Sequence, residues 1–184
     1  MRPNKPIRQS ALTRFFAGLA EQTFQTRLGI ADPPLIDYIS NLLIRFVRQE
    51  TITVRDRKGR PLNQVTHMLA EAQQRVGGAR RTVHQHIGDF TLFWTGLYPE
   101  SLEHRQSPRK PDHLIDYRTQ GKKAYLVASQ IEPDAEDRPT SEVLQRLSDR
   151  FELCMYGLRE IRNEWERSDD DDAPQPIFLS LIHI

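Results

Sequence analysis

Seven apolar side chains recur at alternating steps of three and four residues through three heptads near the end of the chain. They are Leu144, Leu147, Phe151, Cys154, Leu158, Ile161 and Trp165. A helix places such a series on one face, whereas a strand would divide it between two faces. The spacing therefore predicts one long helix, capped at its start by Thr140 or Ser141, that buries this seam. An intramolecular core and an oligomer contact use the same spacing, and both interpretations stay open.

The same periodicity predicts five further helices. They span about residues 11–28, 33–47, 61–76, 79–97 and 111–129. Ser10 and Asp32 are good N-cap residues, and Pro33 fits the first position of a helix. Gly29 offers a left-handed stop, and Gly77-Gly78 breaks or bends the pattern between two helices.

Two of these helices have a well-defined apolar face. In 79–97 the predicted seam is Val83, Ile87, Phe90, Trp94 and Leu97. In 111–129 one face carries Leu114, Tyr117, Gly121, Tyr125 and Ala128. Since Gly121 and Ala128 are small, this face favours the close approach of another helix.

The segments between the helices are polar. Residues 51–55 alternate apolar and polar side chains, which we interpret as an extended connection because a single short strand is unstable alone. Lys58-Gly59 is typical of a turn. We expect a loop at 102–110 and an acidic linker at 132–138.

The chain is thus predicted to be all-α, a single-domain bundle of about five or six helices over residues 10–167. A flexible segment, 1–9, precedes the bundle, and an acidic disordered tail, 168–178, follows it. The codons CTG TCT CTT ATA CAC ATC, the end of a transposon-derived sequencing adapter, encode residues 179–184 in order. We therefore interpret 179–184 as an adapter-derived artefact that replaces the natural sequence.

Composition narrows the class of protein. The chain has 184 residues, a single cysteine and no apolar run near the roughly 20 residues that cross a bilayer. We expect a cytoplasmic protein that needs no disulfide, metal or membrane. The net charge is +1, and +5 without the acidic run 169–172. That mild excess argues against a dedicated nucleic-acid binder.

Motifs of common enzyme sites are missing from the sequence. Gly77-Gly78 lacks the preceding strand of a phosphate-binding loop, and no histidine has glutamate three residues before it, as di-iron bundles require. Paired-cysteine zinc sites and serine or cysteine nucleophile signatures are absent as well. Cys154 lies on the apolar seam, where a small buried residue is expected. We predict neither a cofactor nor a metal.

The segment 84–89 holds the most interesting polar residues. His86 lies about sixty degrees from the centre of the predicted seam, so it should be partly buried, and Asp89 lies one turn further on. His84 points to the opposite flank, which excludes joint chelation of a metal. His86 and Asp89 form a candidate acid–base pair, with Asp116 as a candidate third member, although a core-edge histidine bound to its neighbour explains the pattern more simply.

Tyrosines of the predicted fifth helix are possible additions to that pair. Tyr117 and Tyr125 share a face of the helix. The favoured interpretation is that their rings pack in the core while their hydroxyl groups reach water.

The most basic region spans residues 105–123. Its cations are Arg105, Arg109, Lys110, Arg118, Lys122 and Lys123. They are candidates for contact with phosphates or an acidic partner, whereas a solvated loop and helix face is the simpler interpretation.

Three stretches resemble a bacterial family of proteins without an assigned function. They are residues 24–29, 86–96 and 156–160, which read FQTRLG, HIGDFTLFWTG and YGLRE. The resemblance spans most of 10–167 and implies no activity or catalytic residue.

The leading functional prediction is a non-enzymatic helical interaction protein, acting as a homo-oligomer or as an adaptor with a protein partner. Apolar stripes are abundant, while convergent polar groups are scarce. One alternative is a helical enzyme or ligand-binding protein with its site near His86 and Asp89. Another is a regulator that touches nucleic acid through residues 105–123.

Overall fold

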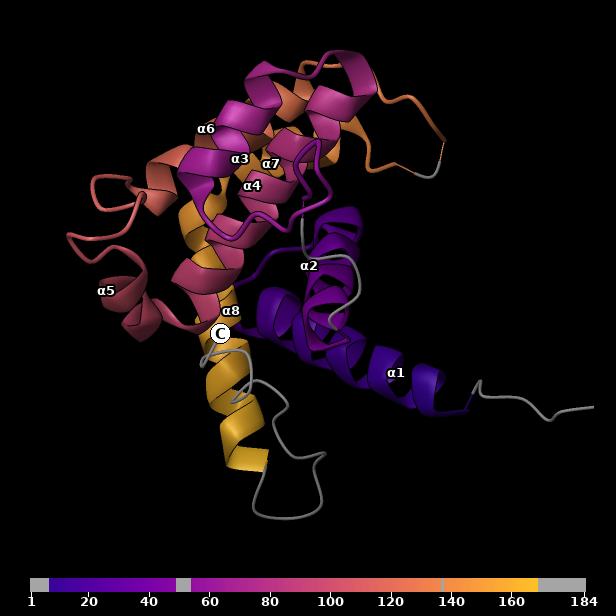
Figure 1. Ribbon diagram of the computed structural model, residues 1–184. Coiled ribbons are helices and arrows are strands. Elements are labelled where there is room, and N and C mark those ends of the chain that lie inside the picture. Colours follow the sequence, from indigo (N-terminus) through magenta and orange to yellow (C-terminus); the bar gives the residue numbers. More distant parts are fainter. Residues whose placement is uncertain (1–6, 49–53, 137, 169–184) are drawn as a thin grey trace, which may run out of the picture. The chain divides into compact units, whose positions relative to one another are not determined.

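The computed structural model describes residues 7–48, 54–136 and 138–168 (Figure 1). The regular secondary structure of these ranges is helical. The described residues also contain an isolated antiparallel β-bridge between Arg55 and Pro61. The predicted all-α class is confirmed. Eight α-helices are present in the described ranges, more than the predicted five or six. Most of the predicted flexible start, residues 51–53 of the predicted extended connection, and 169–184 lie outside the described residues.

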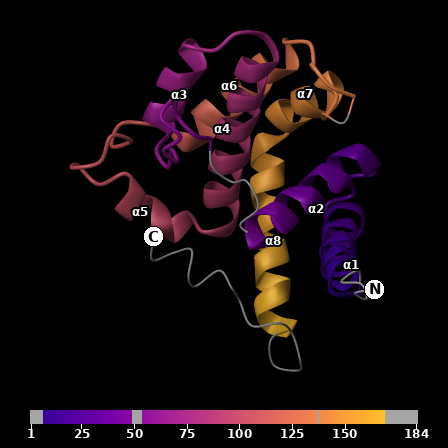
Figure 2. The same ribbon diagram turned by 45° about the vertical axis from the view of Figure 1, so that its right-hand side comes forward.

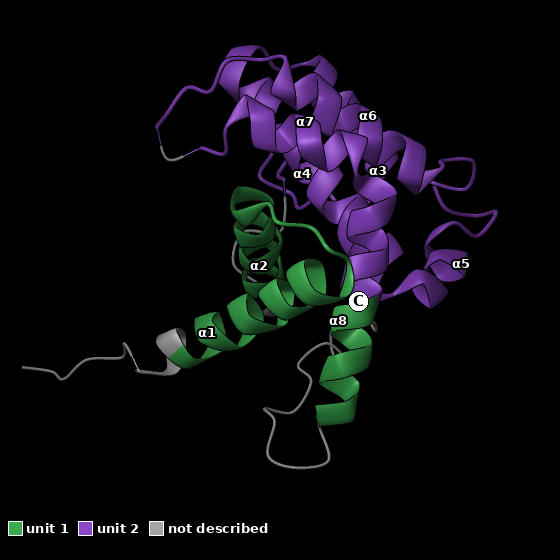
Figure 3. Ribbon diagram, turned by 180° about the vertical axis from the view of Figure 1, so that it is seen from behind, with its two compact units in different colours: residues 1–50, 160–184 green, residues 51–159 purple. Residues whose placement is uncertain are grey.

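The chain divides into two compact units, shown in green and purple in Figure 3. Unit 1 comprises residues 1–50 and 160–184, and unit 2 comprises residues 51–159. Helix α8, Phe151–Ser168, contributes its first part to unit 2 and its remainder to unit 1.

Unit 1 is built from α1 (Ile7–Glu21), the π-helical turn η1 (Gln22–Arg27), α2 (Pro33–Val47) and the end of α8. Asp32 caps α2 as predicted, because its carboxylate accepts the Leu35 N–H at 3.3 Å. Gly29 adopts the expected left-handed conformation, with φ of 67°. The predicted cap at Ser10 is wrong, since α1 begins at Ile7 and Ser10 lies inside it.

Aromatic rings and ion pairs hold the end of α8 in unit 1. The Trp165 ring packs edge-on against Phe16 at 5.2 Å and Phe15 at 6.3 Å between centroids. Arg27 forms ion pairs with Glu160 at 3.3 Å and Glu164 at 2.6 Å.

Unit 2 contains α3 (Val65–Gln73), α4 (Gly77–Leu97), the 3-10 turn η2 (Pro99–Ser101), α5 (Leu102–Arg105), α6 (Tyr117–Ser129), α7 (Ser141–Asp149) and the start of α8. Helix α4 packs against α3 and α6, and α6 also packs against α7 (Figure 2). Every residue from 87 to 98 is buried. Helix α4 is therefore the central helix of unit 2, and its buried surface extends well beyond the predicted seam.

The predicted sixth helix is two helices. α7 ends at Asp149 and α8 begins at Phe151, with Arg150 between them outside the helical conformation. All seven seam residues are nevertheless buried. Thr140 caps α7 as predicted, accepting the Val143 N–H at 3.3 Å. The apolar series continues in phase across the interruption, so spacing alone does not reveal it.

Two predicted helices begin later than expected. α3 begins at Val65 rather than Pro61, because the segment before it folds into a turn in which the Leu62 N–H donates to the Val54 carbonyl. α6 begins at Tyr117 rather than Pro111, since the preceding residues serve other contacts described below.

Residues around the late start of α6 also depart from prediction. Leu114 lies outside the helix with 88% of its surface exposed, so its placement on the apolar face is wrong. The predicted loop 102–110 contains the short helix α5. The close approach expected at Gly121 is confirmed, because a Cβ there would lie 2.5 Å from the Phe151 ring. Among the described helices, none is long and apolar enough to span a membrane.

Candidate functional site

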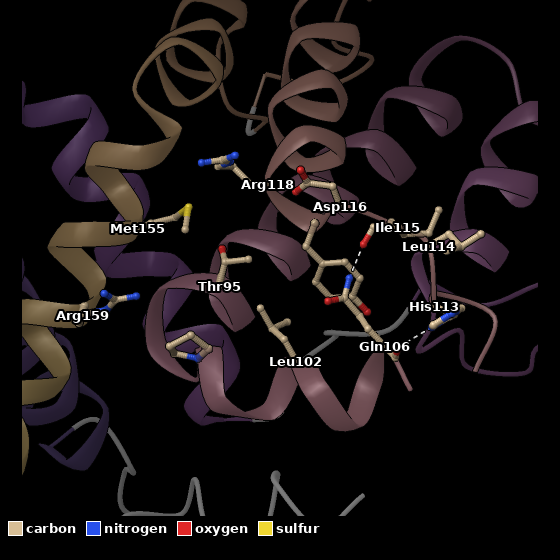
Figure 4. Close-up of a pocket in the computed structure, with 12 residues that line it drawn as sticks. Thr95, Leu102, Gln106, His113, Leu114, Ile115, Asp116, Arg118, Met155 and Arg159 are labelled. Carbon is tan, nitrogen blue, oxygen red and sulfur yellow. Dashed lines mark hydrogen bonds between the residues drawn. The ribbon is translucent and has the colours of Figure 1, made fainter. Parts of the chain in front are cut away.

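A cleft of about 480 Å³ opens on unit 2 where the start of α6 meets α5 and the first part of α8 (Figure 4). Arg118, Met155 and Arg159 lie on one side of the cleft in this view, and His113, Leu114 and Ile115 lie on the other. Its volume falls within the usual range for ligand sites. All six of these side chains are at least partly open to solvent, and two of them are arginines, which suits an extended partner better than an enclosed small molecule.

The loop that forms one wall is fixed by hydrogen bonds. The Gln106 side-chain amide donates to the Ile115 carbonyl, and His113 Nδ1 lies 3.0 Å from the Gln106 carbonyl oxygen. These contacts tie the loop back to the end of α5. The wall is thus preorganised without a partner.

Asp112 anchors the same loop to α3. Its side chain has 0% of its surface exposed. Its carboxylate accepts the backbone N–H groups of Val65 and Thr66 and the Thr66 hydroxyl, each at 2.8 Å. Gln64, at the cap position of α3, makes no side-chain cap. Asp112 therefore caps α3 from a distant part of the chain.

Tyr117 completes this buried network. Its hydroxyl donates to Asp112 at 2.6 Å. Burial, together with the hydrogen bond to the Asp112 carboxylate, raises the pKa of Tyr117 far above its ordinary value. The hydroxyl therefore stays protonated and remains a donor at any physiological pH.

Arg105, the last residue of α5, is stacked on aromatic rings. Its guanidinium carbon is 3.6 Å from the centroid of Trp94 and 5.5 Å from that of Phe90. Burial lowers the pKa of Arg105, which nonetheless stays charged because its ordinary value is so high. Arg105 is thus committed to the core rather than offered to a partner.

The other basic candidates are dispersed. Lys122 pairs with Glu152 at 2.8 Å, and Arg109, Lys110 and Lys123 are exposed and do not line the cleft. Arg118 is the member of the predicted set that lines it. The region 105–123 does not therefore act as a single cationic surface.

The candidates His86, Asp89 and Asp116 occupy different environments. Asp89 is buried and accepts the Tyr125 hydroxyl at 2.7 Å, while His86 is partly buried, as predicted. Asp116 precedes Tyr125 by nine residues. That separation corresponds to about 13 Å of helix rise, so the structure does not bring Asp116 to Asp89.

Asp116 instead caps α6. Its carboxylate accepts the Thr119 N–H at 3.2 Å and the Thr119 hydroxyl at 3.0 Å. Partial burial acts to raise the pKa of Asp116, but the hydrogen bonds from Thr119 and Arg118 and the charge of Arg118 together outweigh it and lower the pKa below the ordinary value. Asp116 is an ionised capping group at the edge of the cleft.

The prediction that the tyrosine hydroxyls reach water is wrong. Tyr117 and Tyr125 are buried, and each donates to a buried carboxylate. Asp112 lies five positions before Tyr117 and Asp89 lies 36 positions before Tyr125, so no local pattern identified these carboxylates as the partners of the hydroxyl groups. Arg159 and Met155 were missed because they flank the seam of α8 at positions that pattern analysis assigns to solvent.

Cys154 is buried on the seam as expected. Over the described ranges, no three His, Cys, Asp or Glu side chains are grouped in a way that would hold a metal ion. Comparison of the chain with protein-family models, curated proteins and solved structures finds no match.

Proposed function

We propose that this protein is a non-enzymatic binding module that holds a carboxylate-bearing, partly apolar segment of a protein partner in the cleft of unit 2. One observation carries the proposal. Arg118 of α6 and Arg159 of α8 line the same cleft with the Met155 thioether. Within the described part of the chain, no hydrogen bond or ion pair engages Arg159. Two guanidinium groups beside apolar surface match a segment that alternates acidic and apolar side chains.

The composition of the cleft favours a peptide over a nucleic acid. Leu102, Leu114 and Met155 supply apolar contacts, which a phosphate backbone does not use. Asp116 adds a negative charge at the edge, which would repel a continuous polyanion but tolerates isolated carboxylates. Leu114, at the rim, offers the most exposed apolar surface.

The same cleft gives little support to an enzyme. Besides the two arginines, its titratable groups are Asp116, which is engaged in capping, His113, whose ring contacts a backbone carbonyl, and Tyr117, whose hydroxyl donates to Asp112. General acid–base catalysis needs two groups that reach the same reacting atoms. A binding role requires only the charges and the shape already present.

A labelled peptide of alternating Glu and Leu residues tests the proposal by fluorescence anisotropy. Arg159→Glu is expected to weaken binding about tenfold or more, since it replaces an attraction with a repulsion. The matched control is Arg109→Glu, which makes the same charge change outside the cleft and should leave the affinity unaltered. Equal loss in both variants, or equal binding of a Lys–Leu peptide, would refute the proposal.

A further inference from the structure

Away from the cleft, a tight basic turn joins the start of unit 2 to α3. We define the basic turn as residues 54–62. It exposes Arg55, Arg57, Lys58 and Arg60, and its one acidic residue is Asp56. Four cations against one carboxylate in such a short segment form a strong local excess of positive charge, although the whole chain carries only +1.

Backbone hydrogen bonds make the basic turn rigid. The Asp56 N–H donates to the Arg60 carbonyl and the Gly59 N–H to the Asp56 carbonyl, both at 2.9 Å. Gly59 has φ of 75°, a backbone conformation that residues other than glycine seldom adopt. The cations are therefore displayed on a fixed backbone rather than on a loose loop.

The Asp56 side chain is used inside the turn. Its carboxylate accepts the backbone N–H groups of Lys58 at 2.8 Å and Arg60 at 2.9 Å, and pairs with the Arg60 side chain at 2.7 Å. The hydrogen bond from the Arg60 backbone is the main cause that lowers the pKa of Asp56. The carboxylate organises the turn and offers little free negative charge to a partner.

Two arginines fasten the basic turn to the end of α3. Arg57 donates to the Gln74 carbonyl at 3.4 Å, and Arg75 donates to the Arg55 carbonyl at 2.7 Å. Arg75 also pairs with the buried Glu71 at 2.9 Å. The Arg55 guanidinium donates within the turn to the Gly59 carbonyl at 2.8 Å. A guanidinium group has five donors, so Arg57 and Arg55 retain donors for a ligand after these contacts.

We propose that the basic turn is a contact surface for the sugar–phosphate backbone of a nucleic acid duplex, separate from the peptide cleft. Guanidinium and ammonium groups carried on one fixed backbone turn match closely spaced phosphates. Val54 is buried, Leu62 is half-buried and Pro61 is the one exposed apolar residue of the turn, so a partner meets charge without an apolar centre. Protein interfaces have such a centre, whereas phosphate contacts do not need one.

The composition of the basic turn also favours a duplex over other polyanions. Single-strand binders stack bases on aromatic rings, and the basic turn contains none. Anchoring to an anionic membrane requires apolar side chains beside the cations. Val76, 84% exposed on the neighbouring connection, is one small side chain and gives too little apolar surface for insertion.

Anisotropy of a labelled, mixed-sequence DNA duplex over about 50 to 200 mM salt tests the proposal with the full chain. The wild type is expected to bind with a steep salt dependence. Lys58→Ala should lower the slope of log affinity against log salt by about one. No hydrogen bond or ion pair holds the Lys58 ammonium within the described residues, so the variant should fold normally.

Lys110→Ala is the matched control, since it removes an exposed lysine from a loop outside the basic turn. Its salt slope should equal that of the wild type. Absence of duplex binding at the lowest salt, or an equal decrease in both variants, would overturn the proposal. So would tighter binding to phosphatidylserine vesicles than to DNA, since that result assigns the turn to a membrane surface.

Discussion

The Asp112 carboxylate accepts the Val65 N–H at 2.8 Å across 47 positions of sequence. One side chain thereby caps the start of α3 and fixes the loop that forms one wall of the cleft. The stability of unit 2 and the shape of the candidate site consequently depend on the same buried carboxylate.

Replacing Asp112 is expected to be severely destabilising. Asp112→Ala leaves the Val65 and Thr66 N–H groups and the Tyr117 hydroxyl without their acceptor in a buried site. The free energy of unfolding should fall by about 3 to 5 kcal/mol, as for other broken buried networks. Urea unfolding followed by circular dichroism measures it. Asp112→Asn keeps one carbonyl acceptor and should lose less, and a loss below about 1 kcal/mol for alanine would contradict the capping role.

The contact between α4 and α6 gives a second test. A Cβ at Gly88 would lie 2.6 Å from the Tyr125 ring, so Gly88→Ala should cost about 1 to 3 kcal/mol through overpacking. Gly18 of α1 has nothing within 4 Å of such a Cβ. Gly18→Ala should instead stabilise by about 0.5 to 1 kcal/mol, because alanine favours helix interiors. Opposite shifts in thermal midpoint are expected, and equal destabilisation would argue against the close approach.

The stacking of Arg105 on Trp94 predicts that two arginine variants lose different amounts of stability. Arg105→Met removes a cation 3.6 Å above the Trp94 ring and should cost about 2 kcal/mol. The matched variant Arg45→Met affects a more open pair, with Arg45 5.7 Å from the Tyr38 ring, and should cost below about 1 kcal/mol. Tryptophan emission should change only in the Arg105 variant, which links the energetic loss to the stacked ring.

Helical class and most buried residues could be predicted from the sequence because apolar periodicity records which face meets the core. The seam from Leu144 to Trp165 is buried throughout, and Asp32 caps its helix. Both are local properties, decided within a few residues of chain. The number of helices could not be predicted from periodicity, because the three-four spacing of apolar residues continues unchanged across the break at Arg150.

The cleft could not be predicted in the same way. Arg118 and Arg159 are 41 positions apart in the sequence, and they line the same cleft only after α6 and α8 have packed. Asp112 acts on residues far earlier in the chain, so no local motif marks it. The basic region 105–123 was visible as composition, but burial of Arg105 and pairing of Lys122 decide which charges a partner can meet.

His84 predicts how unit 2 responds to acid. The side chain is buried, and neither ring nitrogen has a hydrogen-bond partner within the described structure. Burial lowers the pKa of His84 from 6.5 to about 4, with the positive charges of Arg80 and Lys123 acting in the same direction. The folded state therefore holds neutral imidazole over a pH range in which the unfolded chain takes up a proton.

The sign of the pH dependence follows from that difference. Well above pH 6.5 neither state binds the proton, so His84 leaves stability unchanged. As the pH falls from about 6.5 to about 4, the unfolded state binds more protons and the free energy of unfolding drops, by about 3 kcal/mol in the limit. Urea titrations at several pH values should show this loss in the wild type and in the control His67→Leu, whose histidine is exposed, but not in His84→Leu. An unchanged acid loss in His84→Leu would assign the effect to other groups, because that variant has no imidazole to protonate at this position.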